Sequence, residues 1–385
     1  MVSSNPDLME ENLYNSLLKW KPQVLRSEAR TFPADMYTFT EIYELDKKCI
    51  FGKAWFYVGH ISQLQGPGSY FTVDIAEQPL VILQNKVGEL RAFFNVCTHR
   101  AGPVAVGSSK CSRFTCLYHA WSFDLEGNLR GIPDMETAEN FDRSSHALTA
   151  VNVDAWGPFI FVNLAPKCEP LALQLGELPE LFKRYQLGNL AKVHSVDYWT
   201  DANWKVFNEN AAESYHEPSV HPLTWSKYYQ PANTKAEARH YYYLQYAPFH
   251  PNGGLASGFK QGLYIETLNE YEMQCSSIVC LFPNFTLIMN PNNCITFLVD
   301  PQSPVKTRVR VDWLVPDTES AKSPENLEPL IEFFDNLMQE DLRLLPIVQK
   351  GIQSLAYRPG RLCPEREMGV HLFQELVMKH IAPQE

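Results

Sequence analysis

The sequence predicts an α+β protein of two domains, and three observations support this prediction. The chain has 385 residues, which is more than one average domain needs and enough for two hydrophobic cores. Residues 54–165 consist of short apolar segments separated by turn residues, a pattern typical of an all-β domain. Further on, aromatic-rich segments with strand character precede a helical pattern that begins near Ser323. A sheet followed by a long helix indicates an α+β domain.

The expected strands of the first domain are short and rich in aromatic and branched residues. They cover residues 54–59, 70–73, 80–83, 91–96 and 156–164. Gly66, Gly88 and Gly127 lie between them, where turns are expected. A helical pattern over residues 173–185 follows the last strand, so we place the domain boundary near Pro166.

The second domain begins with a segment at residues 193–206 and a helical stretch, and its strands follow. We expect these strands at residues 241–246, 271–279, 285–289, 295–300 and 307–315. The helix from Ser323 onward completes the domain. The sequence has no periodic repeat, which argues against a solenoid or propeller.

Composition excludes several classes of function. An apolar fraction of 45% is typical of a globular protein, and no apolar run is long enough to span a bilayer. A net charge of -11 without a basic cluster argues against a nucleic-acid partner. The first residues show no targeting pattern, so we expect a cytoplasmic location. The nine cysteines are odd in number and scattered, which favours reduced thiols.

Two Cys/His pairs lie close together, Cys97 with His99 and Cys116 with His119. In both pairs the Cys precedes the His. A Rieske centre binds one iron through two thiolates and the other through two imidazoles, so each of its two loops supplies one ligand of each type. Structural zinc sites more often pair like residues, and zinc stays the alternative. Cys111 lies between the pairs, and we expect it to be structural.

The residues around both pairs resemble the Rieske domain of the Rieske-type non-haem iron oxygenases, in the aromatic-ring-hydroxylating dioxygenase superfamily. The similarity covers residues 95–102 and 116–124, with Gly127 after them. One departure is Leu117, where the family usually has Pro. The resemblance implies that Cys97, His99, Cys116 and His119 bind a 2Fe-2S cluster.

A second candidate metal site is at His216 and His221. Residues five apart do not share a face of a regular helix, so the helix must end between them for both imidazoles to reach one ion. We expect Pro218 to end it. Non-haem iron takes two His and one carboxylate. Asp341 lies on an apolar helical stripe and can supply that carboxylate, although a buried Arg or Lys partner explains it equally well. Its neighbour Glu340 is expected to be a surface acid.

Residues 203–221 and 340–354 resemble the catalytic motif and the C-terminal signature of Rieske oxygenase α subunits. The resemblance implies that His216, His221 and Asp341 bind ferrous iron. We expect Asn210, as an outer-shell partner, to orient these ligands. The resemblance also implies an all-β Rieske domain inserted in an α+β catalytic domain, which has a central antiparallel sheet flanked by helices. The implied bounds are residues 1–45 for an N-terminal arm that packs on the catalytic domain, 46–165 for the Rieske 2Fe-2S domain, and 166–385 for the catalytic domain.

Glu213 matches the family's acidic residue that bridges to a Rieske His of the neighbouring chain. This role implies a homo-oligomer, a trimer or stacked trimers. Many ring dioxygenases have an Asp at this position, with one more residue in the segment. A Glu with the shorter segment, as in this chain, resembles the choline, carnitine and glycine betaine monooxygenase branch. A solvated helix residue is the alternative for Glu213.

The expected function is that of a terminal oxygenase, which hydroxylates a small organic substrate with O2 by monooxygenation or oxidative N-dealkylation. The branch resemblance favours a quaternary ammonium or betaine-type substrate. No nucleotide-binding fingerprint appears, so electrons from NADH or NADPH must arrive through a separate flavin/iron-sulfur reductase. The alternatives are a ring-hydroxylating oxygenase acting on an aromatic substrate, a Rieske electron carrier and a zinc-stabilised binding module.

Aromatic side chains of the second domain are candidates for a cage around a quaternary ammonium group, with Glu266 or Glu272 as the nearby acid. A role in the hydrophobic core explains them equally well. The candidates are Tyr241, Tyr242, Tyr243, Tyr246, Phe249, Phe259, Tyr264, Phe282, Phe285 and Phe297.

Overall fold

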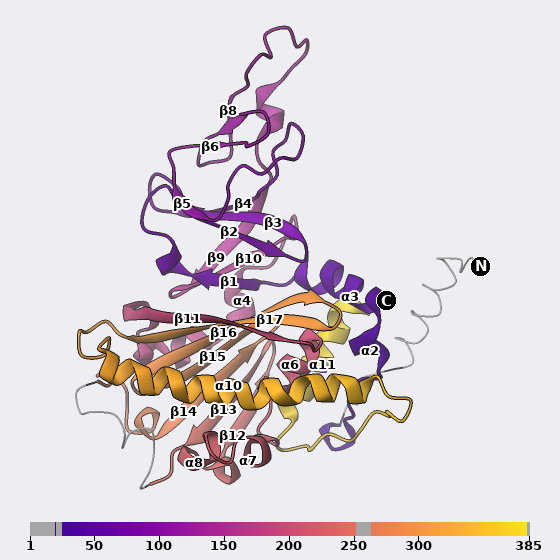
Figure 1. Ribbon diagram of the computed structural model, residues 1–385, viewed down its shortest axis with the longest axis vertical. Coiled ribbons are helices and arrows are strands. Elements are labelled where there is room, and N and C mark those ends of the chain that lie inside the picture. The colour runs from indigo at the N-terminus through magenta and orange to yellow at the C-terminus, as the bar shows by residue number, and fades with distance from the viewer. Residues whose placement is uncertain (1–19, 21–24, 252–262, 383–385) are drawn as a thin grey trace. The chain divides into compact units, whose positions relative to one another are not determined.

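The computed structural model describes residue 20 and residues 25–251 and 263–382. It divides into two compact units: Phe51–Leu173 forms one, and Met1–Ile50 together with Gln174–Glu385 forms the other. The first is an all-β unit inserted in the chain of the second, which is α+β (Figure 1). The predicted fold class is therefore confirmed. Residues 1–19 and 21–24 of the expected N-terminal arm and Phe259 of the expected cage lie outside the described residues.

The inserted unit contains a seven-stranded antiparallel sheet in the order β1-β10-β9-β4-β3-β2-β5. Its strands are β1 (Phe56–His60), β2 (Ser69–Ile75), β3 (Gln78–Gln84), β4 (Leu90–Phe94), β5 (Ser108–Lys110), β9 (Ala150–Trp156) and β10 (Phe159–Asn163). A second, three-stranded sheet consists of β6 (Phe114–Thr115), β7 (Ser122–Phe123) and β8 (Leu129–Gly131).

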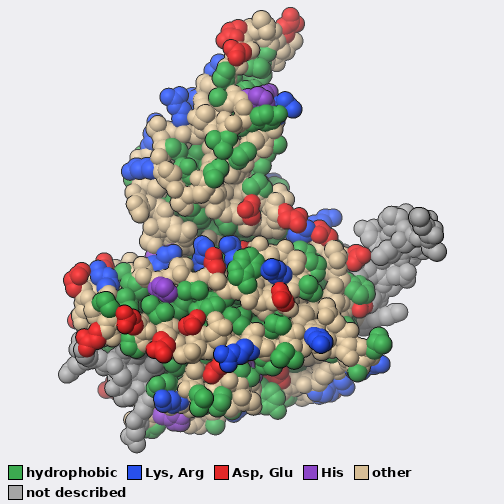
Figure 2. Space-filling model, viewed as in Figure 1, with side chains coloured by type: hydrophobic (Ala, Val, Ile, Leu, Met, Phe, Trp, Pro, Cys, Tyr) green, Lys and Arg blue, Asp and Glu red, His purple; other side chains and the backbone are tan. Residues whose placement is uncertain are grey.

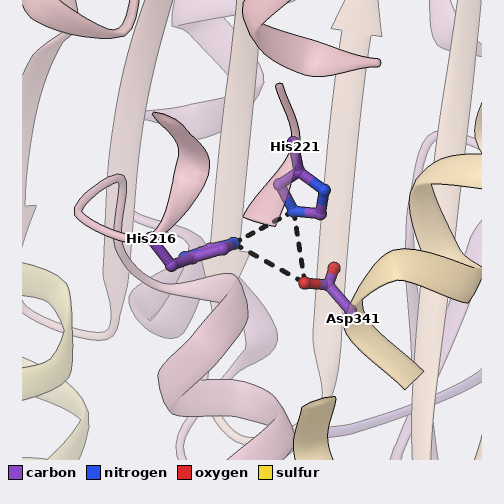
Figure 3. Close-up of side chains that lie close together, drawn as sticks. All are labelled: His216, His221 and Asp341. Carbon is purple, nitrogen blue, oxygen red and sulfur yellow. Dashed lines mark hydrogen bonds and ion pairs between the residues drawn. The ribbon is translucent and has the colours of Figure 1, made fainter. Parts of the chain in front are cut away.

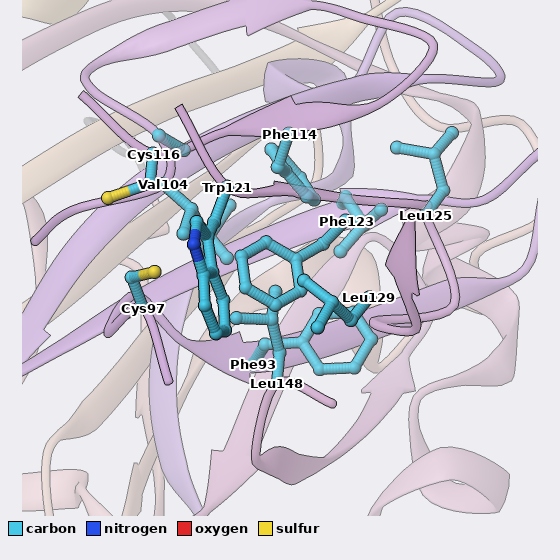
Figure 4. Packing of buried hydrophobic residues seen from close by; sticks show 13 residues of the cluster. Phe93, Cys97, Val104, Phe114, Cys116, Trp121, Phe123, Leu125, Leu129 and Leu148 are labelled. Atoms are coloured by element: carbon cyan, nitrogen blue, oxygen red, sulfur yellow. The ribbon is translucent and has the colours of Figure 1, made fainter. Parts of the chain in front are cut away.

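A hydrophobic cluster lies between these two sheets (Figure 4). Phe93 from β4 and Phe123 from β7 are at its centre, and Gly127 packs so closely that a Cβ atom there would meet the Phe93 ring at 2.6 Å. Burying one such aromatic side chain contributes about 1.5–3 kcal/mol. Cys97 and Cys116 belong to the same cluster, at the end where Trp121 lies. The hydrophobic core therefore supports the loops that carry the two Cys/His pairs.

The larger unit is built on a seven-stranded antiparallel sheet in the order β11-β17-β16-β15-β14-β13-β12. Its strands are β11 (Leu190–Thr200), β12 (Lys235–Arg239), β13 (Tyr242–Pro248), β14 (Cys275–Leu281), β15 (Phe285–Asn290), β16 (Asn293–Ser303) and β17 (Lys306–Pro316). Every residue of β15 is buried. A strand buried on both faces needs cover on both sides, which explains why four of its six residues are apolar (Phe285, Leu287, Ile288 and Met289).

Three longer helices pack against this sheet or against one another: α6 (Trp204–Ala211), α10 (Pro324–Ile352) and α11 (Met368–Ile381). Among them, α6 contacts β16, and α11 contacts β12 and β13. The shorter helices are α2 (Asp35–Thr38), α3 (Thr40–Leu45), α4 (Leu171–Leu175), α5 (Leu178–Leu181), α7 (Glu217–Val220) and α8 (Trp225–Tyr228). None of the described helices is long and apolar enough to cross a membrane. On the face shown in Figure 2, acidic and basic side chains are interspersed over the larger unit.

The start of α6 is fixed by contacts from distant parts of the chain. Asn203 caps the helix by accepting from the Lys205 backbone N–H, and its own N–H donates to Gln349 of α10 at 2.9 Å. Lys205 is fully buried and forms an ion pair with Asp46 of the N-terminal segment. Desolvating two charges is costly, and their direct contact offsets that cost only while both are present. These contacts position α6 immediately before the candidate metal ligands.

Candidate active site

His216 and His221 lie at the two ends of the short helix α7. Their Nε2 atoms are 3.2 Å apart. The expectation that Pro218 ends a helix is wrong: α6 ends at Ala211, and Pro218 lies in the first turn of α7. Proline is tolerated there because the first N–H groups of a helix have no intrahelical partner. The imidazoles converge because α7 is a single turn.

Asp341 of α10 points toward the same two imidazoles (Figure 3). Its Oδ1 is 3.2 Å from His221 Nε2 and 3.7 Å from His216 Nε2. The three ligand atoms lie within 4.8 Å of one another. Asp341 Oδ1 is buried and has no hydrogen bond from the described residues. A buried carboxylate oxygen between two imidazole nitrogens fits a metal cation better than it fits the alternative Arg or Lys partner.

The other nitrogen of each imidazole is held by a carboxylate. Glu213 Oε1 is 2.5 Å from His216 Nδ1, and Glu340 Oε2 is 2.7 Å from His221 Nδ1. Thr224 also donates to Glu340 Oε2, at 2.5 Å. Hydrogen bonds of this kind fix the tautomer and the ring orientation of metal-binding His residues. Because Nδ1 of each ring is bound to a carboxylate, the Nε2 of each ring is left to face Asp341 Oδ1 and the other imidazole.

Glu340 is therefore not the surface acid that was expected. Neighbouring helix positions diverge by about 100° around the axis, so a helical wheel separates Glu340 from Asp341. The imidazole of His221 spans the gap, because its Nδ1 meets Glu340 and its Nε2 meets Asp341. The only sequence signal for this arrangement is the adjacency of the two acids.

These acids also determine the charge of the site. Burial lowers the pKa of His216, but the hydrogen bond and charge of Glu213, together with Asp341, outweigh burial and raise the pKa to about 9. The pKa of His221 is raised in the same way, since Asp341 and Glu340 outweigh burial. The same acids that favour protonated imidazoles also favour a divalent cation, which would take the place of the protons on the two Nε2 atoms.

The two Cys/His loops of the inserted unit share one backbone design. Cys97 N–H donates to the carbonyl five residues on, and its carbonyl accepts from the N–H four residues on. Cys116 makes the same two bonds. The residue four positions after each Cys is an Ala with positive φ, 57° at Ala101 and 58° at Ala120. The two loops are thus structural equivalents, although their His residues are offset by one position.

Close approach of the loops depends on Gly102. A Cβ atom there would lie 2.9 Å from Cys116 Sγ and 2.9 Å from Tyr118 Cβ. Cys97 and Cys116 are 2% and 3% exposed, whereas His99 is exposed and His119 is half-buried. The rings of these His residues are 4.7 Å apart. Thiols inside and imidazoles outside match the division of ligands in a Rieske centre.

Two further features agree with this arrangement. Desolvation, with the charges of His99 and Arg100, lowers the pKa of His119, which favours the neutral imidazole that a metal requires. Trp121 stacks on His99 at 4.6 Å and 9°. Cys111 is half-buried and packs against the hydrophobic cluster of this unit, as its expected structural role requires.

Comparison with known families gives the identity of both units. Residues 54–142 match the Rieske [2Fe-2S] domain, and residues 187–383 match the catalytic domain of the ring hydroxylating alpha subunit. The chain belongs to the Rieske non-haem iron oxygenases. An oxygenase of this family contains a Rieske 2Fe-2S cluster and a mononuclear iron, and it receives electrons from a separate reductase. The match over the catalytic domain removes the electron-carrier and zinc-module alternatives.

Individual relatives agree with the family. This oxygenase is 30% identical to the carnitine monooxygenase oxygenase subunit of Escherichia coli K12, over 87% of this chain and 88% of that protein. It is 28% identical to the chloroplastic choline monooxygenase of Spinacia oleracea, over 92% of this chain and 79% of that protein.

Solved structures agree as well. A structure of the quaternary ammonium Rieske monooxygenase CntA in complex with L-carnitine matches with a TM-score of 0.78 and 27% identity, over 92% of this chain and 96% of that one. A Rhodococcus naphthalene 1,2-dioxygenase matches with a TM-score of 0.75 at 20% identity, over 91% and 94% of the two chains, which shows a shared fold only.

A cavity of about 90 Å³ adjoins the two imidazoles and Asp341 of this oxygenase. A water needs roughly 10–15 Å³ by this measure, so a small organic molecule fits. The floor is one face of the sheet, because its residues are cross-strand partners: Ile278 pairs with both Gln245 and Ile288, and Thr286 pairs with Phe297. The remaining lining residues are Phe207, Asn210, Ala211, Glu213, Glu217, Trp225, Leu337 and Met338.

The expected aromatic cage is largely wrong. Phe297 is the one described member that lines this cavity, and the chain supplies Phe207 and Trp225 instead. The side chains of Tyr242, Tyr243 and Phe285 are buried in the unit, as expected for strand aromatics. The other aromatic residues of the cavity lie on helices, Phe207 on α6 and Trp225 on α8. The cage was inferred from aromatic residues in strands, and a strand pattern gives no information about side chains on helices.

The expectation that Glu266 or Glu272 is the acid beside the cage is also wrong. Glu272 forms an ion pair with Arg184 at 2.9 Å, and Glu266 is exposed. Glu217, which sequence reasoning missed, lines the cavity instead. It is 6% exposed, and Gln245 Nε2 donates to its Oε1 at 2.8 Å. Burial raises the pKa of Glu217 to about 7, against the effects of Gln245 and His216.

Proposed function

We propose that this oxygenase hydroxylates a small quaternary ammonium or betaine-type substrate. The observation that carries the proposal is the convergence of His216, His221 and Asp341 beside a cavity with aromatic walls and an acidic side chain. The faces of Phe207, Trp225 and Phe297 suit an ammonium group because aromatic rings carry negative charge on their faces. Several relatives are named choline or carnitine monooxygenases, and CntA has been solved with L-carnitine.

In this proposal the ligands of the mononuclear iron are His216, His221 and Asp341. Cys97, His99, Cys116 and His119 bind the cluster. The chemistry supplied by the bound groups is oxygen activation with single electrons that come from NADH or NADPH through a flavin/iron-sulfur reductase. The domain bounds belong to the proposal: an arm at residues 1–45, a Rieske domain at 46–165 and a catalytic domain at 166–385.

The residues of the chain orient the site and exclude water from it. Glu213 and Glu340 hold the imidazoles by Nδ1, so both Nε2 atoms keep one direction. Asn210 lines the cavity beside Glu213, where we propose that it positions the substrate or the ligands. Ile278, Ile288 and Leu337 make the walls apolar, which strengthens each electrostatic contact inside.

We also propose that Glu213 joins His216 to a Rieske imidazole of a neighbouring subunit, in a trimer or stacked trimers. Glu213 Oε2 accepts from the backbone N–H groups of Tyr215 and His216, so the carboxylate is held rigidly. The exposed side of His99 in the Rieske domain suits contact with another chain. For a solved quaternary ammonium Rieske monooxygenase, electron transfer is described as inter-subunit.

A reducing compartment, such as the cytoplasm, is the proposed location. All nine cysteines are free, which suits a compartment that keeps thiols reduced. The plant relatives are chloroplastic.

The metal assignment is tested by iron and acid-labile sulfide analysis with low-temperature EPR of the reduced protein. We expect a Rieske signal and one additional iron per chain. Zinc at Cys97 and Cys116 would reject the assignment.

The substrate is tested by supplying electrons and screening choline, carnitine, betaines and aromatic acids for stimulated oxygen uptake with a hydroxylated or dealkylated product. We expect a response to at least one quaternary ammonium compound. A response confined to arenes would reject the proposed substrate in favour of ring hydroxylation.

A further inference from the structure

Four carboxylates surround the candidate iron site, and three of them have a clear task. Glu213 and Glu340 are bound to the imidazoles of His216 and His221. Asp341 belongs to the group of ligand atoms within 4.8 Å of one another. The fourth carboxylate, Glu217, is outside that group and touches neither imidazole by a hydrogen bond.

Glu217 is incompletely satisfied by its surroundings. Its Oε1 accepts from the neutral amide of Gln245, and its Oε2 is buried without a hydrogen bond from the described residues. Gln245 is itself fixed, since Tyr243 donates to its Oε1 at 2.9 Å. A buried carboxylate with one neutral partner carries a large desolvation cost unless a cation comes close to it.

The cavity beside Glu217 is shaped for such a cation. Glu217 begins α7, and Trp225 of α8, Phe207 of α6 and Phe297 of β16 line the same cavity. The ionisable groups that line it are Glu213, Glu217, His216, His221 and Asp341, so no Lys or Arg is among the described lining residues. Aromatic faces and an acid without a basic partner favour a cation that carries methyl groups rather than a neutral molecule of the same shape.

We propose that Glu217 is the anionic anchor for the cationic head of the substrate and thereby selects a quaternary ammonium compound over a neutral one. This inference rests on the proposed function and deepens it, because it names the residue that recognises the positive charge. Glu217 acts in binding and specificity, and it is neither an iron ligand nor a proton donor in this proposal.

The test compares two probes of equal shape and different charge. Choline and its carbon isostere 3,3-dimethylbutan-1-ol differ in one atom, nitrogen or carbon, at the branched head, and tetramethylammonium reports the head group alone. Dissociation constants are measured by calorimetry on the full-length protein with both metals bound. The variants are Glu217→Gln, the charge-preserving Glu217→Asp, and Glu266→Gln as a matched control at an exposed acid.

We expect Glu217→Gln to weaken choline and tetramethylammonium by about 30-fold while the isostere changes by less than about threefold, as for loss of a buried charge pair. Glu217→Asp should keep most of the preference for the cation, and Glu266→Gln should match the unmodified protein. Equal weakening of both probes would mean a structural role and would overturn the proposal. Loss of iron from Glu217→Gln would also overturn it, because Glu217 would then support the metal.

Two outcomes separate this inference from the proposed function. If the unmodified protein binds and turns over a quaternary ammonium compound but Glu217→Gln leaves the charge preference intact, only the role of Glu217 fails. If the unmodified protein binds no quaternary ammonium compound, both fail. If Glu217→Gln does not fold, the proposal is tested with the unmodified protein and Glu217→Asp. Each of these must bind choline more tightly than the isostere by about tenfold or more. Equal affinity for the two probes overturns the proposal.

Discussion

The two candidate metal sites of this oxygenase are built in opposite ways. The proposed cluster ligands come from two neighbouring loops with the same backbone hydrogen bonds and a similar positive φ at Ala101 and Ala120. The proposed iron ligands are the two residues that cap α7 and one residue of α10, far apart in the sequence, and each imidazole is held by a separate carboxylate. The first site depends on local backbone conformation, and the second depends on tertiary packing. Substitutions should therefore affect the two sites independently.

The largest effect is expected from Asp341→Ala. Removing one of three iron ligands should abolish substrate-dependent oxygen uptake and reduce bound iron to the cluster iron alone. The Rieske EPR signal should stay unchanged, because its ligands lie in the other domain. Metal analysis and EPR of the same sample measure both, with Glu332→Ala on the exposed side of α10 as the control. Loss of the Rieske signal would show that the sites are not independent.

Glu213→Gln should separate the sites functionally without emptying either one. Measured at saturating iron, where the lower affinity expected for Glu340→Gln would also not show, both metal contents should stay at the level of the unmodified protein, while turnover falls by about 100-fold or more. Single-turnover measurements with a prereduced cluster would place the defect in electron transfer. Loss of iron instead of activity would mean that Glu213 is a ligand and that the assignment needs revision.

Gly102→Ala tests the backbone-dependent site. The new Cβ would lie 2.9 Å from Cys116 Sγ, and overpacking of this kind costs about 1–3 kcal/mol. We expect the variant to contain less cluster and to have a Rieske domain of lower thermal stability than the unmodified protein. Iron at the proposed mononuclear site should be retained. Gly188→Ala is the matched control, since nothing lies within 4 Å of its Cβ position. An unchanged cluster content would show that the loops can separate without loss of the ligands.

Glu340→Gln tests the packing-dependent site more gently than Asp341→Ala does. Gln keeps the shape and can still accept from His221 Nδ1, but it loses the charge. Support of this kind typically changes metal affinity by about 10–100-fold, and we expect the lower end. Iron affinity from a competition titration measures the change, with Glu332→Gln as the control on the same helix. An effect as large as that of Asp341→Ala would make Glu340 a ligand.

The smallest effect concerns pH and has opposite signs in the two domains. Burial raises the pKa of Glu209 in the catalytic domain to about 7, although hydrogen bonds from Gln374 and Tyr37 oppose it. Its contribution to stability is complete below the unfolded value near 4.5 and is lost as the pH rises through about 7. In the Rieske domain, hydrogen bonds from Asn128 and Arg130 outweigh burial and lower the pKa of Asp124, so its contribution is lost as the pH falls.

We therefore expect the catalytic domain to lose about 1 kcal/mol between pH 5 and pH 8, and Glu209→Gln to remove about half of that loss, because the pKa of Glu217 is also raised to about 7. The full pKa shift is larger, but a buried site relaxes when it ionises. Domain-resolved unfolding by hydrogen exchange measures the difference. An equal response of both domains would contradict the assignment to Glu209.

The comparison also shows what the sequence could predict. The Cys/His loops were visible because their ligands are close in sequence and their spacing has a chemical meaning. The convergence of His216, His221 and Asp341 was predicted from helix geometry and from the family resemblance, and the structure brings their ligand atoms together. Their role as iron ligands stays a prediction.

The wrong predictions concern residues whose environment is set by tertiary contacts. Pro218 starts a helix rather than ending one, because α6 had already ended at Ala211. Glu340 and Glu217 look like ordinary helix acids until the residues that face them, His221 and Gln245, are known. Neither partner can be found from periodicity, because each comes from a distant part of the chain.

The burial of Cys97 and Cys116 has a consequence for the lifetime of the enzyme. Peroxide attacks exposed thiolates first, and an oxygenase that turns over without product releases reduced oxygen species. The two sulfur ligands are 2% and 3% exposed, whereas the imidazole side faces outward. If these residues bind the cluster as proposed, electrons would enter and leave on the imidazole side, while the oxidisable sulfur is kept from solvent by the hydrophobic core.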